Sequence, residues 1–189
     1  MKLIGSDIFS LKVDDIDFQI IISKEDFSDY KILQGEIIFN SYQYDDENMN
    51  EIEVGRINFY IFNTYSNDEF IYCADAISGD LYYVAYAYNL YASDEDYWGS
   101  KMIIDNLYFG IEELTSEEKL FIIELFLKVV NDIFETMGTT IVLFMTKALM
   151  LNIKIQDSKI LLDNLVRIGF IPIYQDEIDF VFGKNITYL

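Results

Sequence analysis

The chain contains no histidine and only one cysteine among its 189 residues. Without histidine there is no Ser-His or Cys-His nucleophile pair and no histidine ligand for a metal ion. A single cysteine, Cys73, excludes a disulfide within the chain, and its apolar and small neighbours predict a buried structural thiol. These absences remove many enzyme classes and favour a reducing, cytoplasmic compartment.

Basic residues are also scarce, because 13 Lys and Arg stand against 33 Asp and Glu, which gives a formal charge of −20. A chain this acidic is a poor ligand for nucleic acid itself. Its charge indicates either a cationic partner or a need for solubility, and it carries no information about the fold. Residues 1–100 hold 20 acids and 5 bases, whereas residues 101–189 hold 13 acids and 8 bases. The acidic surface is therefore expected in the N-terminal half.

Long apolar runs are missing as well. Nowhere do about eighteen uncharged apolar residues follow one another, and the first residues lack the run of about seven apolar residues of a signal peptide. The composition is otherwise that of a folded protein, since 52% of the residues are apolar and there are 15 Tyr and 15 Phe. We therefore expect one soluble domain over residues 1–189.

The hydrophobic pattern predicts an α+β fold with a mixed, largely antiparallel central sheet flanked by helices. Strands are expected at 17–23, buried on both faces, at 31–42, with Gly35 at a bulge or close approach, and at 52–63. Residues 45–50 read as a polar turn. A helix begins at Asn67 or Asp68 and runs toward Asn89, with a possible break at Gly79.

The second half begins with a strand at 101–109. Thr115 and Glu118 have the spacing of a capping box, and the following helix, 120–137, is apolar in nearly every direction and ends at Gly138. A buried strand follows at 140–146. A shorter helix is expected at 158–168, stopped by Gly169, and residues 170–174 and 178–183 form a closing strand pair.

This element order, together with Gly169-Phe170 after the last helix, resembles the Gcn5-related N-acetyltransferase fold over about residues 17–183. The resemblance implies that acetyl-CoA would lie against the strand 102–109 and the N-terminus of the helix that starts near Thr115. It also implies an N-acyltransferase activity, which we keep as the alternative function.

The chain departs from that family where the cofactor's phosphates would bind. The family has a glycine-rich loop, Gln/Arg-x-x-Gly-x-Gly/Ala, whose backbone N–H groups hold the pyrophosphate. Here no glycine follows Gly110 in the loop, and Glu112, Glu113, Glu117 and Glu118 occupy it. Two unit charges 4 Å apart repel by about 4 kcal/mol near a protein surface. Leu165 stands where the family often has a tyrosine general acid. These departures imply that, on a shared scaffold, the family's cofactor site and general acid are missing.

Other candidate sites have simpler interpretations. No carboxylate pair stands out as an acid and base, and the clusters 45–47 and 94–96 lack the alternating pattern of a calcium loop. Ser78-Gly79-Asp80 marks a kink or a cap, or else a buried Asp80. Seven aromatic residues between 82 and 98 form either an exposed platform or, as we expect for most of them, part of the core: Tyr82, Tyr83, Tyr86, Tyr88, Tyr91, Tyr97 and Trp98.

The acidic excess itself has three interpretations. It serves solubility, or it imitates the phosphates of DNA and fills the basic groove of a nucleic-acid-binding enzyme, as phage anti-restriction and anti-CRISPR inhibitors do. It could also match another basic protein, as an immunity protein matches its toxin. Our leading hypothesis is a non-enzymatic acidic protein that binds a basic partner. In its most specific form, the protein is a phage-type inhibitor, anti-CRISPR or anti-restriction, of a DNA-binding enzyme. The residues predicted to contact that partner are Asp45, Asp46, Glu47, Glu51, Glu53, Asp94, Glu95 and Asp96.

Overall fold

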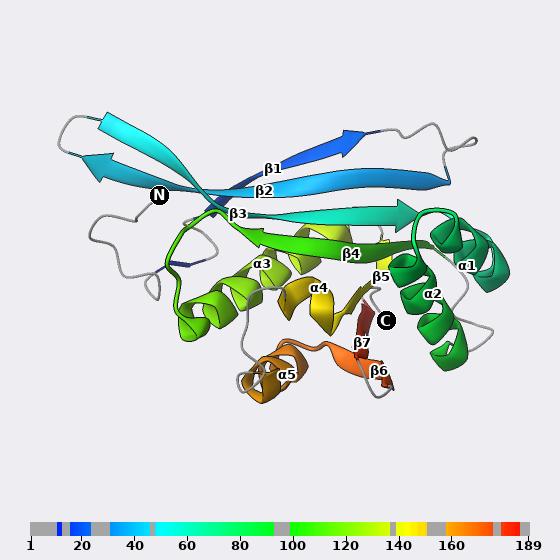
Figure 1. The fold of residues 1–189 in the computed structure, drawn as a ribbon. Helices are drawn as coiled ribbons and strands as arrows, with labels where there is room; N and C mark the ends of the chain where they lie inside the picture. The colour runs from blue at the N-terminus through cyan, green and yellow to red at the C-terminus, as the bar shows by residue number, and fades with distance from the viewer. Residues whose placement is uncertain are drawn as a thin grey trace.

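The computed structural model describes residues 11–12, 16–23, 31–45, 48–92, 99–136, 139–150, 158–175 and 179–185. They form an α+β fold around one seven-stranded sheet in the order β1-β2-β3-β4-β5-β7-β6 (Figure 1). The strands are β1 (Ile16–Ser23), β2 (Ile32–Asp45), β3 (Asn48–Phe62), β4 (Ser100–Phe109), β5 (Thr139–Met145), β6 (Ile171–Gln175) and β7 (Phe180–Asn185). The helices are α1 (Asn67–Asp75), α2 (Gly79–Tyr91), α3 (Ser116–Thr136), α4 (Thr146–Met150) and α5 (Ser158–Arg167).

The sheet is largely antiparallel, and β4 with β5 is the one parallel pair among the described strands. The predicted fold class is therefore confirmed. Among the same residues, no helix combines the length and the apolar character that crossing a membrane requires.

Helices cover both faces of the sheet. Along β4, Met102 and Ile104 belong to the core that includes α3 and α5, whereas Ile103 between them belongs to the core of α1 and α2. Since successive side chains of a strand point to opposite faces, the two cores lie on opposite sides. The α1–α2 core also encloses Lys101, which is fully buried with its ammonium 5.6 Å from the Phe70 ring centre. Burial lowers the pKa of Lys101.

α3 forms as its sequence predicts. The backbone N–H of Thr115 donates to Glu118 Oε2 at 2.7 Å, and the N–H of Glu118 donates to Thr115 Oγ1 at 3.3 Å, so the capping box is present. The helix then packs on the sheet, where the Phe126 ring stacks on Phe39 at 3.9 Å between centres. Gly55 of β3 permits this approach, because a Cβ there would lie 2.7 Å from the Phe126 ring.

The expected helix from Asn67 toward Asn89 is two helices. Ser66, and not Asn67 or Asp68, caps α1 by accepting the N–H of Glu69. Ser78 caps α2 by accepting the N–H of Leu81, so the predicted break at Gly79 is confirmed. Asp80 is exposed on the first turn of α2, which makes the alternative of a buried Asp80 wrong.

Two further predictions need correction. Residues 17–23 are not buried on both faces, since Phe18, Ile21 and Ile22 are more than 40% exposed. The reason is position: β1 is the edge strand and pairs with β2 alone among the described strands. The short helix α4 was not predicted. It directly follows β5, and its start is fixed by Asp179, a residue 33 positions away in the chain that accepts the Thr146 hydroxyl.

Residues 45–50 are not simply a turn, because β2 continues to Asp45 and β3 begins at Asn48. β1 reaches β2 only as far as Ser41, and β4 reaches β3 only from Gly55 onward. The segments 42–45 and 48–51 therefore form strand pairs with each other and extend past the described parts of β1 and β4. We call these two segments the arm, which is visible as the free end of the β2–β3 hairpin in Figure 1. At about 3.3 Å per residue, it extends roughly 13 Å.

Candidate functional site

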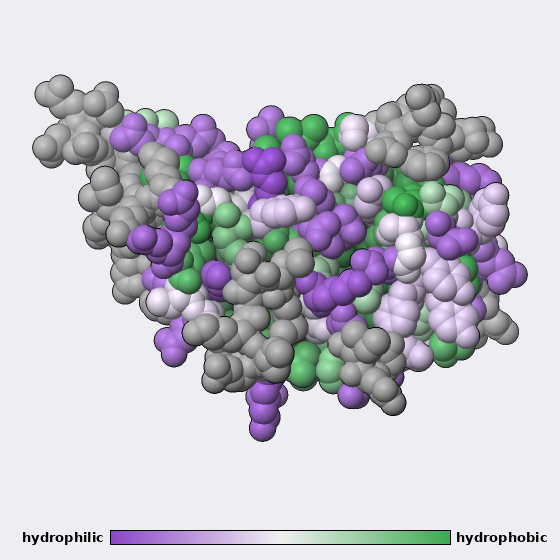
Figure 2. All heavy atoms as spheres, in the orientation of Figure 1, coloured by the Kyte–Doolittle hydropathy of each residue, from purple (hydrophilic) through white to green (hydrophobic). Residues whose placement is uncertain are grey.

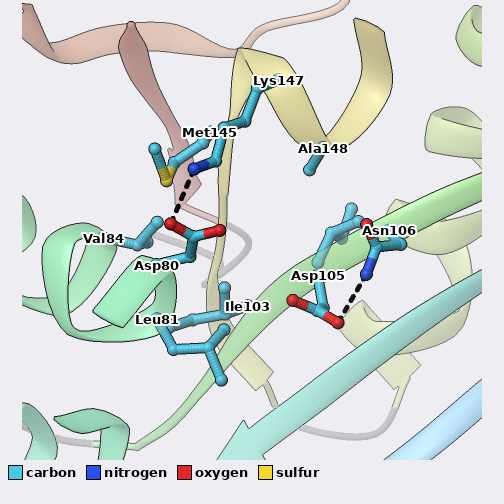
Figure 3. A pocket seen from close by; sticks show the side chains of 10 residues that line it. Asp80, Leu81, Val84, Ile103, Asp105, Asn106, Met145, Lys147 and Ala148 are labelled. Atoms are coloured by element: carbon cyan, nitrogen blue, oxygen red, sulfur yellow. Dashed lines mark hydrogen bonds and ion pairs between the residues drawn. The ribbon is translucent and has the colours of Figure 1, made fainter. Parts of the chain in front are cut away.

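A cavity lies between the first turn of α2, the middle of β4 and the junction of β5 with α4 (Figure 3). Its volume of about 130 Å³ is below the roughly 300–1,000 Å³ of most sites for drug-sized ligands, so it would hold a small group. Apolar side chains form most of its wall: Leu81, Val84, Ile103, Ile104, Met145 and Ala148. The polar groups at the cavity come from Asp80, Asp105, Asn106 and Lys147.

A bulge in β4 brings Asp105 to this cavity. Asn58 of β3 pairs with Asn106 and Phe59 pairs with Ile104, which leaves Asp105 as the extra residue. Asp105 and Asn106 therefore both line the cavity instead of alternating across the sheet. Parallel pairing of β4 with β5 ends at Ile104 and Phe144. The cavity thus lies where the parallel pairing ends, at the carboxyl end of β5 and in the middle of β4.

The carboxyl group of Asp105 is half-buried, and its burial raises the pKa. The side-chain amide of Asn106 donates to Asp105 Oδ2 at 2.7 Å and opposes this rise, while the negative charge of Asp80 adds to it. Asp80 itself contacts Lys147, with 2.6 Å between Oδ1 and Nζ (Figure 3). The cavity thus combines two carboxylates with one ammonium group, which favours a cationic ligand. A carboxyl group with a raised pKa in a cavity is also a candidate general base.

Asp179 holds the junction that carries Lys147. The buried Asp179 accepts hydrogen bonds from the Thr146 hydroxyl, from the Phe180 N–H at 2.8 Å and from the Lys147 N–H at 3.3 Å. These bonds fix the first residue of α4 against β7. Asp179 is therefore a positioning residue for Lys147 at the rim of the cavity.

The N-terminus of α3 does not fit a cofactor's phosphates. Its N–H groups at Thr115 and Glu118 are engaged by the capping box, and the hydrogen bonds that the Thr115 N–H and hydroxyl donate to the Glu118 carboxylate lower the pKa of Glu118. Glu112 and Glu117 are exposed beside it. Gly110 serves packing, because a Cβ there would lie 2.3 Å from the carbonyl oxygen of Glu53. Carboxylates thus stand where a pyrophosphate would need donors.

Of the eight residues predicted to contact a partner, five lie outside the described residues: Asp46, Glu47, Asp94, Glu95 and Asp96. Asp45 ends β2, and Glu51 is exposed on the arm. Glu53 differs from Glu51, since both of its oxygens accept from the Arg56 guanidinium at 2.9 Å. Arg56 offsets the charge of Glu53, so Glu51 contributes more to the negative potential of this strand.

Sequence reasoning did not identify the cavity residues as a site. Asp105 and Asn106 do interrupt an otherwise apolar strand, and this interruption was the available signal for a bulge. Asp80 was considered only as part of a kink or cap. No sequence pattern joins Asp80 to Lys147, because 67 positions separate them.

The aromatic residues 82–98 divide between surface and core. Tyr82, Tyr86 and Tyr91 are exposed, whereas Tyr88 is buried and Tyr83 packs its ring edge-on against Tyr174. Tyr97 and Trp98 lie outside the described residues. The expectation that most of these rings lie in or over the core is therefore wrong for three of the five described.

Comparison of the chain with protein-family models, with curated proteins and with solved structures gives no match in any of the three.

Proposed function

We propose that this protein is a non-enzymatic acidic binding protein whose arm enters a basic groove of a protein partner, in its sharpest form a DNA-binding enzyme. The observation that carries the proposal is the arm itself, a paired segment that extends past the described parts of β1 and β4 and whose sequence contains Asp45, Asp46, Glu47 and Glu51. A projecting two-stranded ribbon, with its strands about 4.8 Å apart, is narrow enough to enter a channel in which a protein holds a nucleic-acid strand. Its carboxylates would replace phosphates there.

Two further observations support a binding role over a cofactor-dependent one. The formal charge of −20 steers cationic surfaces toward the molecule. The first turn of α3 carries Glu117 and Glu118, whose negative charge disfavours a phosphate group there. The proposal places this encounter in a reducing, cytoplasmic setting, in keeping with Cys73, a buried free thiol whose burial raises its pKa. The cluster Asp94-Glu95-Asp96 remains a predicted second contact.

The test uses two variants of equal charge. The arm variant changes Asp45, Asp46, Glu47 and Glu51 to the corresponding amides. The surface variant does the same at four exposed acids elsewhere: Asp17, Glu117, Asp132 and Asp163. Each removes four of the 33 acids, so each changes the formal charge from −20 to −16.

DNA-binding proteins from a cell lysate are held on beads that carry duplex DNA. The wild type, the arm variant and the surface variant are then added to separate samples at the same ionic strength. The wild type and the surface variant should release the same basic protein, and the arm variant should not. Binding of the released protein to the wild type, measured without DNA, should weaken strongly from about 50 to about 500 mM NaCl, over which the Debye length falls about threefold. Equal release by the two variants, or none by the wild type, would overturn the proposal.

A second candidate, an N-acyltransferase that uses acetyl-CoA, is favoured by one observation. Asp105 lies half-buried in the middle of β4, where its pairing with β5 ends, and could accept a proton from an amine. The family resemblance is compatible with this location, but the N-terminus of α3 leaves the cofactor's pyrophosphate without donors. Calorimetry with acetyl-CoA separates the candidates. Micromolar affinity for acetyl-CoA that is the same in the wild type and the arm variant supports the transferase, and no heat of binding rejects it.

A further inference from the structure

A second feature of the surface lies on α1 and α2, on the face turned away from the sheet. Six large side chains on these helices or just before α1 are exposed: Tyr65, Tyr72, Tyr82, Tyr86, Leu90 and Tyr91. In Figure 2, pale residues gather over α1 and α2 at the right of the molecule. Tyr82, Tyr86 and Leu90 are four residues apart and so form one line along α2. We call these three residues the tyrosine stripe.

The tyrosine stripe is not needed for the core. α2 already packs on the sheet with another set of side chains: Leu81, Val84, Ala85, Ala87 and Tyr88. The rings of Tyr82 and Tyr86 stack on each other, with 6.0 Å between centres and 19° between planes. Stacked rings that face solvent offer a flat surface at little entropic cost, and such tyrosines are enriched at the centres of protein interfaces.

The charged side chains of α1 and α2 themselves are all acidic, although Lys31 pairs with Glu69 and Lys147 pairs with Asp80. No Lys or Arg occurs from residue 57 to residue 100, a stretch that contains all of α1 and α2 and seven acids. Of those acids, Asp68 and Asp75 are exposed on α1, and Asp80 is exposed on the first turn of α2. A partner at this face must therefore be cationic to be attracted. Aromatic faces also discriminate between cations, because a planar guanidinium stacks on them and sheds water more readily than an ammonium group.

We propose that the α1–α2 face binds an arginine-rich segment of a protein partner. Arginine guanidinium groups stack on Tyr82 and Tyr86, and the exposed carboxylates of Asp68 and Asp75 attract their charge. This inference takes one element from the proposed function, namely that the partner is positively charged. It names a different surface from the arm, and arginine as the side chain that is recognised.

The test compares two peptides of equal length and charge, nine arginines and nine lysines, by calorimetry with the full chain. Any polycation will bind a protein of this charge, so the measured quantity is the ratio of the two dissociation constants, in which the contribution of net charge cancels. The wild type should bind the arginine peptide at least about fivefold more tightly. The preference should persist in added salt while both affinities fall.

Three variants locate the preference. Tyr82→Leu with Tyr86→Leu keeps apolar area and helix propensity but removes the aromatic faces, so the ratio should fall to about one. Tyr108→Leu, at a tyrosine of β4 that is 45% exposed, is the matched control and should keep the wild-type ratio. The arm variant should also keep the ratio even where both affinities fall.

Equal affinity of the wild type for the two peptides would overturn the inference, and so would an unchanged ratio in the double Tyr→Leu variant. Circular dichroism of that variant verifies that α2 is intact, and single Tyr→Leu changes replace it if it is not. If the DNA-bead experiment overturned the role of the arm, the expected ratio of the two peptide dissociation constants would not change. The two proposals therefore fail in different measurements.

Discussion

At the scale of the residue, Asp105 has surroundings that its place in the chain does not suggest. It follows three apolar residues of β4, yet the bulge turns it toward a cavity together with Asp80. Burial and the charge of Asp80 disfavour its ionised form, so its pKa lies above the ordinary value of 3.8. A group of this kind contributes most to stability when it is protonated, and its contribution is lost as pH rises through the folded-state pKa.

Asp105→Asn should therefore raise the free energy of unfolding at pH 7, since it removes a carboxylate that folding places in an unfavourable site. The gain should shrink as pH falls and vanish below about 3.8, where the wild-type carboxyl is protonated in both states. Urea unfolding at several pH values measures it. Asp163→Asn, an exposed position on α5, is the control and should give a smaller gain. A loss of stability at pH 7 would contradict the assigned direction of the pKa.

At the scale of the element, α3 depends on its capping box. Thr115→Ala removes the hydroxyl oxygen that accepts the Glu118 N–H and should lower the free energy of unfolding by about 1 kcal/mol. Thermal or urea unfolding measures the loss. Thr136→Ala at the other end of α3 removes a hydroxyl that donates to the Asp132 carbonyl, and it should change stability by less than about 0.5 kcal/mol. Equal effects of the two changes would mean that the cap contributes little.

At the scale of the whole molecule, charge acts against the folded state. Like charges held close together repel, and salt screens that repulsion: the Debye length is about 30 Å at 0.01 M and about 10 Å at 0.1 M. The melting temperature should therefore rise with NaCl over this range. The surface variant, at −16, should gain less from salt than the wild type at −20. A melting temperature that falls with salt would show that the ion pairs outweigh the repulsion.

Local features of the fold were predictable from the sequence because neighbouring residues produce them. The capping box of Thr115 and Glu118, the break at Gly79 and the stop at Gly169, where φ is +92°, each involve a few adjacent residues. The close approach at Gly35 was predicted as well, and a Cβ there would lie 2.4 Å from the Phe59 ring. Exposure of β1 was not predictable, because an apolar run has the same appearance in an edge strand and in a central one.

The sequence alone determined the α+β class, the order of most elements and the strongly negative charge, since composition and hydrophobic period are properties of the chain read in order. Only the tertiary structure decided that Asp80, Asp105 and Lys147 share a cavity, that the β2–β3 hairpin extends past its neighbours as an arm, and that Tyr82 and Tyr86 face solvent. Each of these depends on strand register and helix packing, which join residues far apart in the chain.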